Sequence, residues 1–96
     1  MTTAELATAL PEIVTEQVPG LKSKELLDRR DAAIPKALCG KTYPICIKQG
    51  SGAMFEDMDG NKFLDWVGGV GVLNIGYSHP EVIEAVKKQT EKYFHT

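Results

Sequence analysis

Few residues in this 96-residue chain have the type and spacing that chemistry requires. Nine lysines supply amines, but none sits in an apolar stretch of sequence that would keep it an uncharged nucleophile. Cys39 and Cys46 are the only cysteines, and their spacing matches neither a Cys-x-x-Cys redox pair nor a zinc site. We therefore expect two reduced thiols packed as small hydrophobes, and no metal site. A disulfide between them is sterically possible but unexpected in a cytosolic chain.

Two further signals allow both a chemical and a structural interpretation. His79 could act as a general base, but it stands at the start of a predicted helix, where capping or packing is favoured. The triplet Gly50-Ser51-Gly52 invites a phosphate-loop interpretation, yet no Lys-Ser/Thr follows it and the next element reads as a strand. A plain turn is favoured there, and no residue of the chain qualifies as a catalytic or cofactor-binding group.

The elements that must position these residues centre on a β-hairpin predicted at Asp59-Gly60. Alternating apolar residues flank this pair, and Asp-Gly suits a type I′ turn, which needs positive φ at both central residues. Glycines follow at positions 68, 69, 71 and 76, where a backbone without Cβ atoms can take tight or left-handed conformations. Trp66 continues the strand alternation, so we expect it in the core.

Helices are predicted on both sides of this hairpin. Ser23 is expected to cap a helix that Pro35 ends, and a short strand over 43–48 should lead into a turn at 49–52. Downstream, Ser78-His79-Pro80-Glu81 has the spacing of a capping box before a run with one apolar helical face. No Gly, Asn or Pro ends this helix before residue 96, so the sequence looks truncated there.

Composition narrows the class of protein. With 43% hydrophobic and 25% charged residues, the chain is typical of one small globular domain. Its net charge of −2 gives no support for a nucleic-acid partner, and no apolar run approaches the length of a membrane span. The N-terminus lacks the features of a secretion signal, so a cytoplasmic location is expected. Residues 1–20 are predicted to be an N-terminal extension, either a frayed helix or disordered.

The order of hairpin, glycine-rich connector and helix start resembles the N-terminal region of class III pyridoxal-phosphate-dependent aminotransferases. The matching residues are Asp57, Asp59, Gly60, Phe63, Leu64, Asp65 and Trp66, then Gly68-Gly69-Val70, Val72-Leu73-Asn74, Gly76, His79 and Pro80. Residues 22–35 resemble the leading helix of the 4-aminobutyrate branch. Tyr77 stands where the family usually has His, and an aromatic or imidazole ring there could fill similar space.

The resemblance implies that residues 21–96 are an α+β fragment of the type I α/β fold of pyridoxal-phosphate (PLP) transferases. This N-terminal segment would belong to the small-domain part and comprise helices, a β-hairpin and a C-terminal helix. The full-length enzyme would move an amino group from 4-aminobutyrate to 2-oxoglutarate through PLP, as a homodimer. Its Schiff-base lysine and phosphate cup would lie further along the sequence, so the 96 residues alone should be inactive.

Within this chain, the resemblance implies a pocket wall. Val70 is the best candidate for substrate contact, with Gly71 beside it; alternatively, both only close a tight connector between hairpin and helix. Ornithine, acetylornithine and diaminobutyrate aminotransferases remain possible, because the residues that select the donor lie mostly outside this chain. The alternative from another class is a non-catalytic α+β module that binds a partner through its exposed hairpin.

Overall fold

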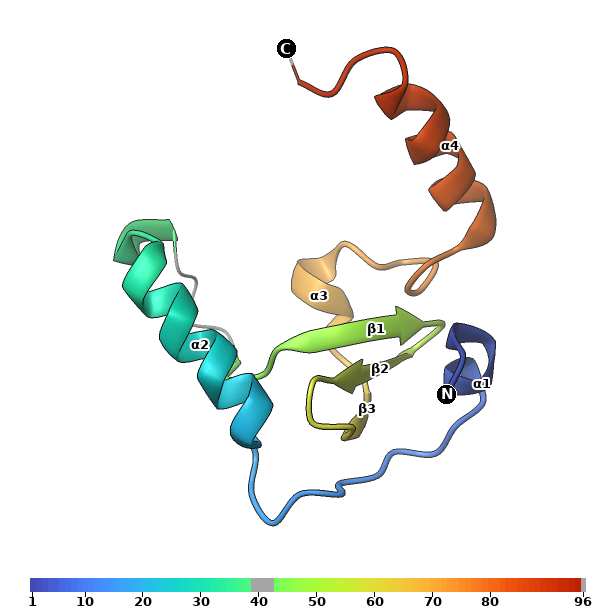
Figure 1. The fold of residues 1–96 in the computed structure, drawn as a ribbon. Helices are drawn as coiled ribbons and strands as arrows, with labels where there is room; N and C mark the ends of the chain where they lie inside the picture. The colour runs from blue at the N-terminus through green and yellow to red at the C-terminus, as the bar shows by residue number, and fades with distance from the viewer. Residues whose placement is uncertain (39–42, 96) are drawn as a thin grey trace.

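The computed structural model describes residues 1–38 and 43–95. Its elements, in chain order, are α1 (Thr3–Ala7), α2 (Leu21–Ala33), the 3₁₀ turn η1 (Lys36–Leu38), β1 (Ile47–Ser51), β2 (Met54–Asp57), β3 (Lys62–Leu64), the kinked turn α3 (Gly68–Gly71) and α4 (Pro80–Thr90). Figure 1 shows the sheet at the centre, with α2 and α4 extending away from it in different directions. Helices around one small antiparallel sheet confirm the expected α+β composition.

The sheet has the order β1-β2-β3, and both pairings are antiparallel. Phe55 of β2 lies opposite Phe63 of β3, and their rings stack with centroids 5.0 Å apart. Cross-strand aromatic pairs of this kind stabilise a sheet and fix its register. The hairpin predicted from the Asp-Gly pair is therefore confirmed.

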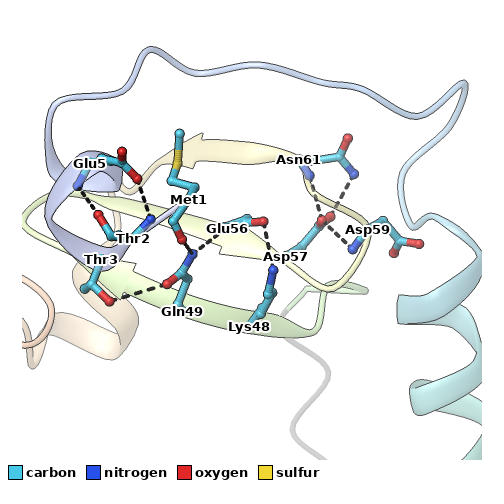
Figure 2. Close-up of polar contacts among 10 residues, drawn as sticks. All are labelled: Met1, Thr2, Thr3, Glu5, Lys48, Gln49, Glu56, Asp57, Asp59 and Asn61. Atoms are coloured by element: carbon cyan, nitrogen blue, oxygen red, sulfur yellow. Dashed lines mark hydrogen bonds and ion pairs between the residues drawn. The ribbon is translucent and has the colours of Figure 1, made fainter.

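The turn of this hairpin is not the predicted type I′ turn. Gly60 has a φ of 90°, but Asp59 does not have positive φ, and four residues (58–61) join the strands. The buried carboxylate of Asp57 organises them: it accepts the backbone N–H groups of Asp59 (2.9 Å) and Asn61 (2.8 Å) and the Asn61 Nδ2 donor (2.8 Å; Figure 2). An aspartate that hydrogen-bonds to the following backbone groups sets this longer turn.

Strand β1 begins and ends four and three residues later than predicted, because residues 49–51 belong to the strand and not to a turn. Packing explains why a glycine, Gly50, lies inside this strand. A Cβ atom on Gly50 would lie 2.6 Å from Cδ1 of Tyr77, whose ring covers this position. The reversal into β2 is confined to Gly52 and Ala53, where Gly52 takes a φ of 58°.

The N-terminus of helix α2 is capped by a residue from another element, so the predicted Ser23 cap is wrong. Gly20 is the N-cap residue and makes no side-chain cap bond, while Ser23 lies in the first turn. The carboxylate of Asp59, in the hairpin turn, accepts the backbone N–H groups of Lys22 (2.8 Å) and Ser23 (2.9 Å). Partial burial would raise the pKa of Asp59, but the hydrogen bonds from Ser23 and Lys22 outweigh it and lower the pKa.

Helix α4 begins at Pro80, as predicted, but without the predicted capping box. The N-cap residue is His79, which makes no side-chain cap bond. Ser78 stands one position earlier with a φ of 58°, in the left-handed region. The Ser-x-x-Glu spacing is therefore shifted by one residue from the geometry that a capping box requires.

Several of the first 20 residues contact the sheet. Thr2 and Glu5 form a capping box at α1, and Gln49 of β1 bonds to Thr3 and to the carbonyl of Met1 (Figure 2). Leu6 of α1 is fully buried. Further on, the backbone of Glu12 pairs with that of Lys62, which covers the outer edge of β3. The division of the chain at residue 20 stays a prediction.

The apolar core is small. Among the described residues, Leu6 and Met54 are the buried apolar side chains. Trp66 is 89% exposed, so its predicted place in the core is wrong here: β3 ends at Leu64, and the strand alternation does not reach residue 66. The radius of gyration is 15.0 Å, above the roughly 13 Å of a compact domain of about 100 residues. Within the described ranges, no helix is long and apolar enough to cross a bilayer.

Candidate functional site

A hollow of about 450 Å³ lies between the sheet and the glycine-rich connector. Most of its wall is apolar or aromatic, including Ile45, Phe55, Phe63, Trp66 and Val70, and its polar members are Tyr43, Asp65 and Tyr77. Among the described residues, no lysine or arginine lines it. Such a wall suits the hydrocarbon part of a small molecule and offers no cation for a carboxylate.

Asp65 follows β3 and holds the connector. Its backbone N–H donates to the carbonyl of Ala53 at 2.8 Å. Its carboxylate accepts three successive backbone N–H groups, from Val67 (2.8 Å), Gly68 (2.8 Å) and Gly69 (3.2 Å). Successive N–H groups of this kind form a concave anion site, and here the chain's own carboxylate fills it.

Tyr77 completes this arrangement from the other end of the connector. Its hydroxyl donates to Oδ2 of Asp65 at 2.6 Å, and its backbone pairs with that of Gly52 (N–H···O distances 2.8 and 3.2 Å). The ring also meets Phe55 edge-on, with centroids 6.1 Å apart. We call this unit, the Asp65 carboxylate with the Tyr77 hydroxyl, the Asp65–Tyr77 clamp.

The clamp has a defined protonation state. Burial, followed by the hydrogen bond to Asp65 and its negative charge, raises the pKa of Tyr77 to about 12. The hydrogen bond from Tyr77 lowers the pKa of Asp65, with help from the N–H groups of the connector, although burial opposes this. At neutral pH the pair is therefore a neutral phenol that donates to a carboxylate.

Sequence reasoning did not assign this clamp to the site. The sequence predicts only a space-filling ring at Tyr77, and it places Asp65 only in the hairpin pattern. One local signal was present: an aspartate placed two and three residues before Val67 and Gly68 often bonds to their backbone. The partner hydroxyl, twelve residues away, carries no such local signal.

The two predicted substrate residues have different positions. Val70 lines the hollow, and the residue is 80% exposed. Gly71 is not among the lining residues, and a Cβ added to it would meet no atom within 4 Å. Substrate contact stays a prediction for both residues, and the geometry of the hollow favours Val70.

The described lysines do not form a PLP site. Lys48 pairs with Glu56 at 3.3 Å and Lys62 pairs with Glu12 at 2.7 Å, both away from the hollow lining. Residues 1–38 and 43–95 also contain no group of three His, Cys, Asp or Glu side chains that could hold a metal ion. The described residues therefore do not hold the cofactor by themselves.

The histidine and cysteine side chains considered as reactive groups lie in surroundings that indicate a structural role. The Nδ1 atom of His79 is buried at the start of α4 and has no hydrogen-bond partner among the described residues. Cys46 donates weakly from Sγ to the carbonyl of Ser23 (3.6 Å). Cys39, the other half of the considered thiol pair, lies outside the described residues.

Comparisons with known proteins add an independent line of evidence. The family model of class III aminotransferases matches residues 37–96. A 4-aminobutyrate aminotransferase from Mycobacterium leprae is 40% identical over 85 residues, which cover 88% of this chain and 19% of that protein. An alanine/serine racemase from Pyrococcus horikoshii is 37% identical over 86 residues, which cover 90% of this chain and 18% of that protein.

The fold of this chain is also similar to that of solved transaminase structures. The crystal structure of an omega-transaminase from Sphaerobacter thermophilus superposes with a TM-score of 0.63 at 27% identity, over 82% of this chain and 19% of that one. The chain thus spans about a fifth of the length of the curated relatives that it matches. The family match covers more than half of the chain and includes the hairpin, the connector with its clamp, and α4. This chain belongs to the class III aminotransferase family.

Proposed function

We propose that these residues are the N-terminal segment of a PLP-dependent aminotransferase and form one wall of its substrate site. The enzyme transfers an amino group from an amino donor to a 2-oxo acid. The observation that carries this proposal is the apolar hollow beside the glycine connector, within the region that the family model matches. PLP, when bound, would supply the electron sink for this chemistry, and the lysine that binds it is proposed to lie further along the enzyme's sequence than these 96 residues.

The proposed donor is 4-aminobutyrate and the proposed acceptor is 2-oxoglutarate. Support comes from the relative of that name at 40% identity and from the chemistry of the hollow. Its apolar wall would contact the methylene chain of the donor, while the cation that binds the donor carboxylate would come from another part of the enzyme. Ornithine, acetylornithine and diaminobutyrate remain alternative donors, because their hydrocarbon chains suit the same wall.

A second function is favoured by one comparison. The alanine/serine racemase covers 90% of this chain at 37% identity, so the segment is compatible with an enzyme that inverts an amino acid. A racemase needs no 2-oxo acid acceptor, whereas an aminotransferase consumes one in every cycle. This difference separates the two functions in a single assay.

We also propose a cytoplasmic homodimer for the full-length enzyme. The support for self-association is the apolar surface that the chain presents, on Trp66 and on Val82, Ile83 and Val86 of α4. Exposed apolar side chains of this kind are buried when two subunits associate through them. Sedimentation of the full-length enzyme tests the proposal, and a monomer at micromolar concentration would contradict it.

The activity test uses the full-length enzyme with PLP. We expect glutamate to form from 2-oxoglutarate with 4-aminobutyrate, and a panel of ω-amino acids and ornithine ranks the donors. A separate reaction follows the optical purity of L-alanine and L-serine without any 2-oxo acid. Loss of optical purity without transfer from any donor would contradict the aminotransferase and favour the racemase. Neither activity would contradict both.

A further inference from the structure

We propose that Asp65 and Tyr77 are positioning residues for Val70, so that the Asp65–Tyr77 clamp sets the width of the hollow. The proposal rests on the proposed function, in which the hollow receives the donor, and extends it to two residues whose polar atoms bond to the chain itself. Asp65 would act on Val70 through the connector, and Tyr77 would act through Asp65.

Packing does little to hold the connector. Gly68, Gly69 and Gly71 all have positive φ, and a Cβ added to Gly68 or Gly71 would meet no atom within 4 Å. Val70, between these glycines, is 80% exposed. With so few contacts, the position of this turn depends on its hydrogen bonds, and the carboxylate of Asp65 accepts three of them.

The clamp in turn is fixed to the sheet at one place. The backbone N–H of Asp65 donates to the carbonyl of Ala53, and the backbone of Tyr77 pairs with Gly52. Gly52 and Ala53 form the reversal between β1 and β2, so both halves of the clamp are anchored to the same turn. The 2.6 Å bond between the two side chains then links the start of the connector to its end.

Loss of this bond should therefore release Val70 while the ring of Tyr77 stays in place. Tyr77→Phe keeps the edge-on contact with Phe55 and the cover over Gly50, and removes only the hydroxyl. Oδ2 of Asp65 would keep only the long bond from Gly69 (3.2 Å). The turn that carries Val70 would then sample more positions relative to the opposite wall.

The first experiment measures kcat/KM of the full-length Tyr77→Phe enzyme for a series of ω-amino donors of increasing chain length. We expect the preference between long and short donors to fall by about tenfold, the size that one methylene contact commonly contributes. Tyr93→Phe is the matched control, since Tyr93 is 61% exposed and its hydroxyl makes no hydrogen bond to another described residue. An unchanged preference in Tyr77→Phe would overturn the proposal.

A double-mutant cycle then tests whether the clamp acts through Val70. Val70→Gly removes the side chain that the clamp positions, so adding Tyr77→Phe to it should not change donor preference any further. If Tyr77→Phe changes the preference equally in both backgrounds, the clamp acts by another route and the proposal is wrong. Asp65→Asn is a second variant for the cycle: with Oδ1 kept on the N–H groups of Val67 and Gly68, Nδ2 takes the place of Oδ2 and cannot accept the hydrogen bond from Tyr77.

Hydrogen exchange of backbone amides separates this proposal from the proposed function. In Tyr77→Phe, the amides of Gly68 and Gly69 should exchange faster, while that of Glu84 in α4 should not change. Unchanged exchange at the two glycines would overturn the clamp whatever the donor kinetics show. Faster exchange, combined with donor preference that Val70→Gly does not alter, would keep the clamp and contradict the placement of the donor in the hollow.

Discussion

The carboxylate of Asp59 accepts the backbone N–H of Ser23 at 2.9 Å, although the two residues are 36 positions apart in sequence. The bond joins the turn of the β-hairpin to the first turn of α2, where backbone N–H groups have no partner within the helix. A negative charge at this end is also favoured by the helix dipole. The helix and the hairpin are therefore connected by a side chain that belongs to the predicted turn motif.

Removal of this cap should loosen the start of α2. We expect Asp59→Ala to accelerate hydrogen exchange at the amides of Lys22 and Ser23 and to reduce the helical circular-dichroism signal. Asp28→Ala is the control, because Asp28 is exposed and forms an ion pair with Lys24 one turn earlier in the same helix. Equal exchange rates in Asp59→Ala and the unaltered chain would show that the cap contributes nothing.

Acidification should have the same effect as that substitution. The folded-state pKa of Asp59 is lowered, so its stabilising contribution is present above the unfolded value of about 3.9 and is lost as the pH falls through the folded value. Exchange at Lys22 and Ser23, corrected for the intrinsic effect of pH, should rise over that acid range. In Asp59→Ala the acid-dependent part at these amides should disappear, and its persistence would contradict the assignment.

The hydroxyl of Tyr77 should lose its proton at a higher pH than an ordinary tyrosine. Its pKa is raised to about 12, so the clamp contributes stability that is complete below the ordinary tyrosine value of about 10 and is lost as the pH rises through about 12. A phenolate absorbance titration should show one step near pH 12 that Tyr77→Phe removes and that Asp65→Asn shifts downward. A step for Tyr77 near pH 10 in the unaltered chain would contradict the hydrogen bond to Asp65.

The isolated 96 residues should be marginally stable or self-associating. Only Leu6 and Met54 are buried apolar side chains among the described residues, while Val82, Ile83 and Val86 of α4 are 41–53% exposed. Exposed apolar surface favours association. Sedimentation should show oligomers that Val86→Lys reduces and that the control Lys88→Ala does not. A monomer with a sharp, concentration-independent thermal transition would contradict this prediction and favour an independent interaction module.

The isolated chain should also fail to bind PLP at one lysine. Lys48 and Lys62 pair with carboxylates, and no lysine of the described part of the chain lines the hollow. After incubation with PLP and reduction by borohydride, peptide mapping should show weak labelling spread over several lysines. Stoichiometric labelling of a single lysine would contradict the assignment of the Schiff-base residue to other sequence.

A larger side chain at position 70 should narrow the hollow. We expect Val70→Phe in the full-length enzyme to lower kcat/KM for long donors, by an amount that corresponds to about 1–3 kcal/mol of activation free energy, with less effect on short donors and none on the cofactor absorbance. Leu10→Phe serves as the control, because Leu10 is exposed and does not line the hollow. Unchanged donor selectivity would make Val70 part of the connector only, and loss of the cofactor would make it a packing residue.

The sequence predicted those features that depend on neighbouring residues. The Asp-Gly pair predicted the hairpin, and Pro80 predicted the start of α4, because both act through local backbone geometry. The sequence predicts a turn at 49–52 because glycine is usually a turn residue, whereas Gly50 lies in β1 at a place where the ring of Tyr77, 27 positions later, leaves no room for a Cβ atom. Contacts at that separation leave no periodic or spacing signal.

The same reason explains what was missed at the site. The connector and Val70 could be proposed from the glycine pattern, but the bond between Tyr77 and Asp65 requires the fold to bring two distant side chains together. Trp66 shows the opposite error. Strand alternation predicts its burial, but β3 ends at Leu64, and Trp66 is 89% exposed in the wall of the hollow.

The carboxylate of Asp65 accepts three successive N–H groups of the connector, which together form an N–H cup. This arrangement affects the thermodynamics of ligand association. Because Asp65 supplies the anion from within the chain, these N–H groups are ordered when the chain folds and need no bound ion. A ligand that meets this wall would find it preorganised and would lose less affinity to the conformational entropy of loop ordering. Phosphate or chloride in the buffer should accordingly not compete for this cup. The wall should be as rigid in the free enzyme as in its complexes.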